Sequence, residues 1–170
     1  MLIGVMSDSH DRIEAIRAAI ERFNSEDVEL VLHAGDIVSP FSAREFEKLK
    51  CKIICVKGNN DGDTTALRKF LGKFGGELKG IFCKLEVADK KIALTHGESP
   101  DVVEALILSG KYDIVIYGHS HETVIDRRNN VLVINPGSCS YPIKNGVVTI
   151  GKGTIALLEV EKMSAKLLEI

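Results

Sequence analysis

The sequence predicts an α/β fold, a four-layer-like β-sandwich in which two sheets pack face to face with flanking helices. In the first half of the chain, short apolar runs of strand type alternate with amphipathic helical segments. In the second half, short strands come in pairs joined by turn residues, which is typical of β-hairpins. No repeat or Pro/Gly/Ser-rich linker divides the 170 residues, so we expect residues 1–170 to form a single domain.

The first half reads as βαβ units on a largely parallel sheet. Strands are expected at residues 2–6, 30–33 and 52–56, and helices at 13–23, 42–50 and 64–74. The first helix is indicated by apolar side chains on one face: Ile13, Ile16, Ile20 and Phe23. Ser42 is expected to cap the second helix, and Gly75 and Gly76 follow the third.

The second half predicts two hairpins, one helix and a closing edge hairpin. The hairpins pair residues 82–87 with 91–95 and 123–127 with 131–135. Between them, Asp101 is expected to cap a helix that ends before Gly110, and residues 114–117 form another strand. Residues 154–160 and 165–169 form the last hairpin. Together these elements need two sheets with helices outside to bury their apolar faces.

Composition argues against several classes of protein. Hydrophobic residues make up 45% of the chain and charged residues 27%, as in globular proteins, and the net charge of -2 offers no basic surface for nucleic acid. No stretch approaches the ~20 apolar residues that a membrane span needs. We therefore expect a soluble, cytoplasmic protein without a membrane or nucleic-acid partner.

The four cysteines form no Cys-x-x-Cys pair, and most lie within apolar runs. Packing in the core is therefore favoured over a disulfide or a zinc site. Cys139 differs because it follows a loop of Asn135, Pro136, Gly137 and Ser138, and its role is left open.

Polar residues follow the ends of five expected strands, where an α/β fold places its site. Taken singly, each is more typical of a helix cap, a turn or a hydrogen-bonded structural residue. Their joint occurrence, with four of the five histidines, predicts a metal site instead. The residues are Asp8, His10, Asp36, Asn59, Asn60, Asp61, His96, His119 and His121.

Other polar residues nearby are assigned to structure. His33 lies inside a strand and is expected to be a buried structural histidine. Capping or solvated roles are expected for Asp11, Arg12, Asp63 and Glu98.

The types of ligand predict two divalent ions. Mixed carboxylate, imidazole and amide ligands suit Mn²⁺, Ni²⁺, Fe²⁺ or Zn²⁺, whereas Mg²⁺ fits such a set less well. Seven of the residues named above, all except Asn60 and Asp61, are the expected ligands; they exceed the needs of one ion and suffice for two if one carboxylate bridges. Two ions about 3.5–4 Å apart are a standard arrangement for displacement at phosphorus.

At these residues the sequence resembles the calcineurin-like metallophosphoesterases. Their pattern of Asp-x-His, Gly-Asp, Gly-Asn-His-Asp, a lone His and Gly-His-x-His occurs here in order across residues 8–121, except that Asn60 stands in place of one histidine. The small size and the loop at 135–138 resemble the compact YfcE-type phosphodiesterases of archaea and bacteria.

The resemblance implies a phosphodiesterase that attacks small phosphate esters with a hydroxide bridging two ions. It assigns the first ion to Asp8, His10, Asp36 and His121, and the second to Asp36, Asn59, His96 and His119. Asp36 is then the bridge. It also implies that Asn59, Asn60 and Asp61 serve catalysis, although Asn60 lacks the acidity of the family's histidine and is limited to donating a hydrogen bond.

Two other functions remain open at this point. One is a protein-interaction module, as in a retromer subunit of the same fold, and the other is a nuclease. The resemblance further suggests a homodimer or homotetramer. Residue spacing alone identifies neither the substrate nor the native metal.

Overall fold

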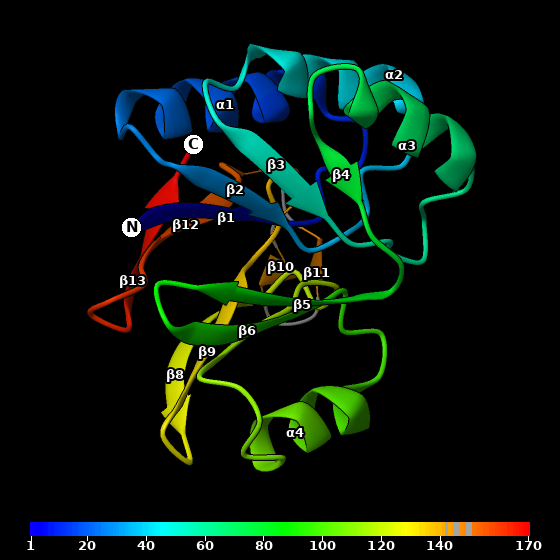
Figure 1. Cartoon of the computed structure of the whole chain (residues 1–170). Coiled ribbons are helices and arrows are strands. Elements are labelled where there is room, and N and C mark those ends of the chain that lie inside the picture. The colour runs from blue at the N-terminus through cyan, green and yellow to red at the C-terminus, as the bar shows by residue number, and fades with distance from the viewer. Residues whose placement is uncertain (142, 145–146, 149–150) are drawn as a thin grey trace.

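The computed structural model shows two sheets packed face to face, with helices on both outer sides (Figure 1). It describes residues 1–141, 143–144, 147–148 and 151–170. The predicted sandwich with flanking helices is confirmed. Of the helices in the described part of the chain, none is long and apolar enough to cross a membrane.

The first sheet has six strands, and its centre is parallel. In spatial order they are β13 (Ser164–Glu169), β12 (Thr154–Glu159), β1 (Leu2–Met6), β2 (Leu30–His33), β3 (Lys52–Cys55) and β4 (Glu77–Leu78). β1 pairs in parallel with β2, β2 with β3 and β3 with β4, as the βαβ pattern predicts. The closing hairpin lies at the other edge, where β12 pairs antiparallel with β1 and β13 with β12.

The second sheet has five strands and contains the two predicted hairpins. Its order is β5 (Phe82–Val87), β6 (Lys90–Thr95), β7 (Ile114–Ile116), β9 (Val131–Pro136) and β8 (Thr123–Arg128). β7 pairs in parallel with β6 and β9, so these three strands end at the same edge. A separate antiparallel pair, β10 (Ile143–Lys144) and β11 (Val147–Val148), was not predicted, and neither was β4.

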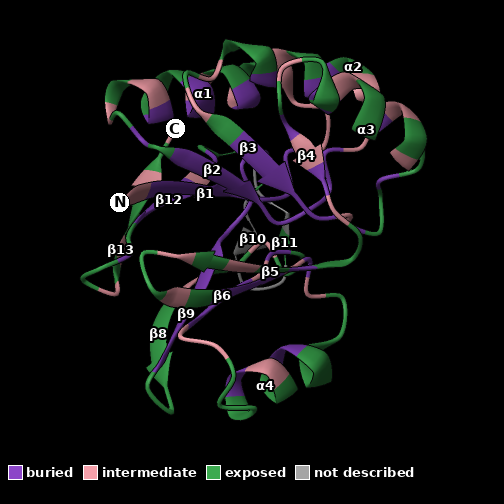
Figure 2. Ribbon diagram, viewed as in Figure 1, coloured by how far each residue is buried: buried purple, intermediate pink, exposed green. Residues whose placement is uncertain are grey.

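Helices cover the outer faces of both sheets. The first sheet is covered by α1 (Ile13–Ser25), α2 (Pro40–Ala43), the 3-10 helix η1 (Arg44–Lys48) and α3 (Thr64–Gly72), and the second by α4 (Pro100–Leu108). Figure 2 shows buried residues concentrated on the strands and exposed residues on the outer sides of the helices.

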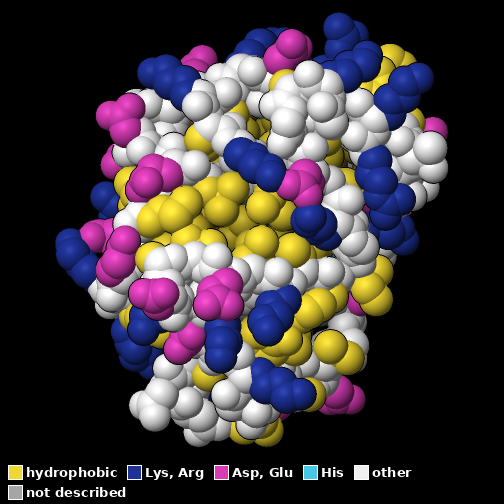
Figure 3. Space-filling model, in the orientation of Figure 1, with side chains coloured by type: hydrophobic (Ala, Val, Ile, Leu, Met, Phe, Trp, Pro, Cys, Tyr) yellow, Lys and Arg dark blue, Asp and Glu magenta, His cyan; other side chains and the backbone are white. Residues whose placement is uncertain are grey.

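Three apolar clusters hold the four layers together. The cluster between the sheets joins residues such as Val5 and Leu32 of the first sheet to Leu94 and Ile116 of the second. A second cluster packs α1, η1 and α3 on the first sheet, and a third packs α4 on the second. Because apolar burial is the main favourable term in folding, these layers fix the strand ends that carry the site. On the face in Figure 3, hydrophobic side chains form a band between the sheets, and charges of both signs intermingle.

Two predicted caps were wrong. The segment after β2 begins its helix at Pro40 with Ser39 at the cap position, because proline suits the first turn of a helix. Ser42 lies within this helix and donates to Asp11 Oδ1 at 2.6 Å. At α4 the cap is Ser99, whose side chain accepts from the backbone N–H of Val102, and Asp101 lies in the first turn.

Candidate metal centre

The predicted ligands meet at one edge of the sandwich. They follow the carboxyl ends of β1, β2 and β3 in the first sheet and of β6 and β7 in the second. Five of them have a positive backbone φ, which residues other than glycine adopt rarely. They are Asp8 (52°), His10 (42°), Asp36 (61°), His119 (66°) and His121 (59°). Such strain persists where the surrounding structure imposes it, and it gathers at functional sites.

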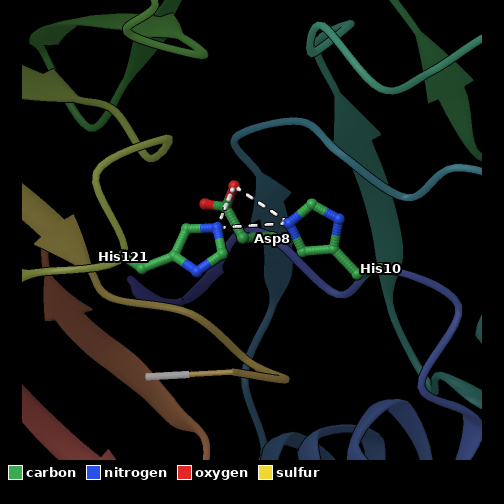
Figure 4. A group of neighbouring side chains, drawn as sticks. All are labelled: Asp8, His10 and His121. Carbon is green, nitrogen blue, oxygen red and sulfur yellow. Dashed lines mark hydrogen bonds and ion pairs between the residues drawn. The ribbon is translucent and has the colours of Figure 1, made fainter. Parts of the chain in front are cut away.

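The first group consists of Asp8, His10 and His121, which point toward one another in Figure 4. Asp8 Oδ1 lies 3.3 Å from His121 Nε2 and 3.7 Å from His10 Nε2. The two Nε2 atoms are 3.2 Å apart. Three atoms that can bind a metal therefore face one small volume, although His10 and His121 are 111 residues apart in the sequence.

The second group consists of Asp36, Asn59, His96 and His119. Asp36 Oδ2 lies 3.4 Å from His96 Nε2. Asn59 Oδ1 lies 3.0 Å from His96 Nε2 and 3.0 Å from His119 Nδ1. A carboxylate oxygen, an amide oxygen and two imidazole nitrogens thus converge.

The two groups adjoin through their carboxylates. Asp36 Oδ2 is 3.4 Å from His96 Nε2 and 3.8 Å from His10 Nε2, so the same oxygen faces both groups. Asp8 also reaches the second group, because atoms of Asp8, Asp36 and His96 all lie within 4.8 Å of one another. The structure therefore brings all seven predicted ligands together and leaves two carboxylates between the groups.

Glycines make this close approach feasible. A Cβ at Gly58 would lie 2.2 Å from Asp36 Oδ1, and one at Gly118 would lie 1.9 Å from Ser7 Oγ and 2.7 Å from Asp8 Oδ2. Any other residue at either position would displace a carboxylate of the site.

The site is strongly polarised. Burial alone would raise the pKa of Asp8, yet the imidazoles of His10 and His121 outweigh it and hold the carboxyl pKa well below its usual value. Burial likewise opposes ionisation of Asp36, but His96 and Asn60 lower its pKa to about 2. Burial would lower the pKa of His96, but Asp36 and Asp8 raise it to about 9.

The surroundings of Asp8 Oδ1 indicate whether the first group can accommodate a cation. Among the described residues Asp8 Oδ1 has no hydrogen-bond partner, although Asp8 is fully buried. A buried carboxylate oxygen without a donor is costly unless a cation compensates it. The seven side chains therefore have the chemistry and the placement that divalent ions require.

Hydrogen bonds on the outer side of the site orient its imidazoles. His96 Nδ1 donates to the carbonyl of Ala34 at 2.8 Å, and His121 Nδ1 donates to the carbonyl of Tyr141 at 2.8 Å. Each bond fixes the tautomer and leaves Nε2 facing the site.

Comparison with known proteins identifies the family. A sequence model of the calcineurin-like phosphoesterase superfamily domain matches residues 1–163. The chain belongs to this superfamily. It is 47% identical over 163 residues to phosphodiesterase MJ0936 of Methanocaldococcus jannaschii, covering 95% of each chain. A solved archaeal phosphodiesterase superposes with a TM-score of 0.91 at 43% identity over all of both chains.

More distant proteins are similar in sequence or in fold. Phosphodiesterase YfcE of Escherichia coli is 24% identical over 151 residues, covering 80% of this chain and 78% of YfcE. Vps29 of Entamoeba histolytica, solved with zinc, shares the fold with a TM-score of 0.69 at 18% identity, covering 100% of this chain and 98% of Vps29. Relatives of this chain are thus named as phosphodiesterases, which are hydrolases, and membership in the family implies divalent metal ions.

Asn60 and Asp61 both form hydrogen bonds that support the second group. Asn60 donates from its backbone N–H to Asp36 Oδ1 at 2.8 Å and from Nδ2 to Asp36 Oδ2 at 2.7 Å. Asp61 is buried, and its oxygens accept from the backbone N–H groups of Gly58, Asp36 and Val38 at 2.8, 3.1 and 2.7 Å. Asp61 therefore ties the two loops together through backbone N–H groups.

The loop at residues 138–141 is a part of the site that the search of strand ends did not detect. Ser138 Oγ and Ser140 Oγ donate to the carbonyl of Asp8 at 2.9 and 2.8 Å. The backbone N–H of Cys139 donates to the carbonyl of Ser7 at 2.9 Å. The only sequence signal was the turn chemistry of Asn135 to Ser138. Cys139 is buried, and burial raises the pKa of its thiol to about 12, so it behaves as a core residue.

Most structural assignments near the site were correct. His33 is buried, accepts from the backbone N–H of Gly35 at Nδ1 and lies 3.1 Å from Ser9 Oγ through Nε2. Asp11 accepts from the backbone N–H of Ser39, Asp63 caps α3, and Glu98 is exposed. Arg12 occupies the N-cap position of α1 without a side-chain capping bond, and its guanidinium donates instead to the carbonyl of Ser140.

Proposed function

We propose that the chain hydrolyses small phosphodiesters with two divalent ions held by the first and second groups. The observation that carries this proposal is Asp8 Oδ1, buried without a donor between His10 and His121. The proposed ligands of the first ion are Asp8, His10, Asp36 and His121, and those of the second are Asp36, Asn59, His96 and His119. Asp36 is the proposed bridge because one of its oxygens faces both groups.

The two ions, when bound, supply positive charge beside the phosphoryl oxygens and lower the pKa of water toward neutrality. The protein side chains hold that arrangement. Asn59 turns its oxygen to both imidazoles, so its Nδ2 is left to donate to a phosphoryl oxygen. Asn60 donates a hydrogen bond to each oxygen of Asp36 and so holds the carboxylate where it faces both groups. No described residue of the two groups other than the imidazoles is suited to protonate a leaving alkoxide.

The proposal also includes the identity of the metal, the class of substrate, the cellular location and the oligomeric state. Mn²⁺ or Ni²⁺ is favoured because four of the seven ligands are imidazoles, which hold Mg²⁺ poorly. Small phosphate esters are the expected substrates, with no nucleic-acid or membrane partner, and a cytoplasmic location and a homodimer or homotetramer remain predictions from the sequence.

A matched pair of aspartates tests the function. Wild type, Asp36→Asn and Asp63→Asn are stripped of metal, reloaded with Mn²⁺ and assayed on bis-p-nitrophenyl phosphate. Asp63 is a helix cap on α3, a role that asparagine also fills, so this control should retain activity. Wild type should depend on added metal, and Asp36→Asn should be inactive while folded. Full hydrolysis by metal-free wild type would overturn the proposal.

A further inference from the structure

Tyr141 contacts the first group through its backbone, and its exposed aromatic ring has no part in the chemistry described above. The carbonyl of Tyr141 accepts from His121 Nδ1 at 2.8 Å, so its backbone touches a proposed ligand. Tyr141 nevertheless keeps 43% of its surface exposed. Exposed aromatic residues at the rim of a site are well suited to binding flat rings, because they offer a large contact area with few rotatable bonds.

Tyr141 is held in place from two sides. Its backbone N–H donates to Ser138 Oγ at 2.9 Å, and that hydroxyl donates in turn to the carbonyl of Asp8 at 2.9 Å. The guanidinium of Arg12 lies over the ring, with its central carbon 5.4 Å from the ring centre, and also donates to the carbonyl of Ser140. A cation at this distance attracts the ring face.

The position of the ring is therefore tied to the ligands on either side of it. Arg12 follows His10 by two residues, and the Tyr141 carbonyl contacts His121, so one anchor is close in sequence to the first group and the other belongs to it. A ring that is already oriented loses little conformational entropy when it binds a second ring. Phosphate held at the metal centre would bring the rest of its ester to this rim.

We propose that Tyr141 is a stacking surface for an aromatic group, such as a nucleobase, esterified to the phosphate bound at the metal centre. This inference rests on the proposed function and narrows its substrate class to nucleotide and aryl phosphoesters. Arg12 holds the ring, and the ring face turned away from Arg12 receives the substrate. Stacking of this kind tolerates different bases, because every base has a π-face.

A second exposed aromatic residue provides the matched control. Phe82 is 38% exposed and lines a groove of about 410 Å³ between β5 and α4, where its ring packs edge-on to Tyr112 at 6.1 Å. Thr95 and Gly97, which flank His96 in the sequence, also line this groove. Phe82 thus matches Tyr141 in exposure, but its ring is already paired with Tyr112.

The test measures binding rather than turnover. Phosphonate analogues of adenosine 5′-monophosphate and ribose 5-phosphate, with a methylene in place of the ester oxygen, are titrated calorimetrically into the Mn²⁺-loaded full chain. Wild type should bind the adenosine analogue about fivefold or more tightly than the ribose analogue. In Tyr141→Ala this ratio should fall toward one, whereas Tyr141→Phe and Phe82→Ala should keep it.

The metal content of each variant is also measured. An unchanged metal content shows that a variant has lost only the stacking ring, whereas a lower content shows that its first group no longer binds an ion. Equal affinity of wild type for the two analogues would overturn the inference, as would a ratio that survives Tyr141→Ala or disappears in Phe82→Ala. Failure of wild type to cleave any diester would instead overturn the proposed function, on which the inference depends.

Discussion

The two groups of the metal centre use similar ligands but differ in how their carboxylates are satisfied. In the first group, Asp8 Oδ1 is buried and has no hydrogen-bond partner among the described residues. In the second group, both oxygens of Asp36 already accept from Asn60. The second group is thus organised by hydrogen bonds before a cation arrives, whereas in the first group Asp8 Oδ1 has imidazoles at 3.3 and 3.7 Å but no hydrogen bond within the described part of the chain. A single centre can therefore combine a preorganised half with a half that a cation stabilises.

The largest expected effect comes from the carboxylate that faces both groups. Asp36→Asn removes the negative charge of a carboxylate whose Oδ2 lies 3.8 Å from His10 Nε2 and 3.4 Å from His96 Nε2. Losing charge stabilisation of several kcal/mol corresponds to a fall of about 10³-fold or more in kcat. Steady-state kinetics and metal analysis of the folded variant check this, with circular dichroism as the control. Retention of both ions by Asp36→Asn would refute the bridge.

A second prediction separates the two groups. His121→Ala should lose the ion of the first group, and His96→Ala the ion of the second, so each variant should bind one ion fewer than wild type. Activity should fall by at least about 10²-fold in both, because both ions act on the same phosphate. Elemental analysis of dialysed protein gives the count. If either variant keeps the wild-type count, that histidine is not a ligand.

A third prediction uses the histidine that lies outside both groups. Burial lowers the pKa of His33 to about 4, against 6.5 for the ordinary side chain, despite nearby carboxylates. The folded protein thus binds this proton less readily than the unfolded chain, so the stability that neutral His33 contributes is present above pH 6.5 and is lost as pH falls toward 4.

His33→Ala should therefore destabilise the metal-free protein by a few kcal/mol at pH 7, and the difference from wild type should shrink as the pH falls from 6.5 to 4. Urea unfolding at several pH values measures it. Metal content should stay unchanged, and loss of metal from folded His33→Ala would contradict the structural role.

The smallest expected effect concerns Asn60, which stands where the family pattern has histidine. Asn60→His supplies an acid near the leaving group but removes the amide donated to Asp36 Oδ2. A positioned acid contributes about 10²–10⁴-fold, yet Asp61 is engaged with backbone N–H groups and cannot orient the imidazole, so we expect a gain nearer 10-fold. The gain should appear only for esters with poor leaving groups. Wild type that cleaves alkyl and aryl diesters at equal rates would refute this role.

Much of the site could be predicted because it depends on local patterns. An apolar run in the sequence indicates each strand. In an α/β fold, the polar residues that follow parallel strands meet at one edge of the sheet. Asp8, Asp36 and Asn59 could therefore be placed together before any contact was known. The same logic set His33 apart, since it lies within β2 rather than after it.

What could not be predicted depends on contacts between distant segments. Ser138 reaches the carbonyl of Asp8 across 130 residues, and no local pattern marks its hydroxyl. The resemblance implies that Asp61 serves catalysis, which stays a prediction, but the bond from the backbone N–H of Asp36 to its carboxylate depends on tertiary packing. The cap at Ser39 was missed because Ser42 was predicted to cap the helix, whereas the helix begins at Pro40.

The most direct test of a shared two-ion centre is the number of ions bound per folded chain, measured together with stability. Metal-free protein is titrated with Mn²⁺ while calorimetry counts the sites and a parallel melt follows the unfolding temperature. We predict two ions per chain and a rise in unfolding temperature as Asp8 Oδ1 gains its cation. A single ion in a fully active chain, or two ions that leave the unfolding temperature unchanged, would contradict the shared centre.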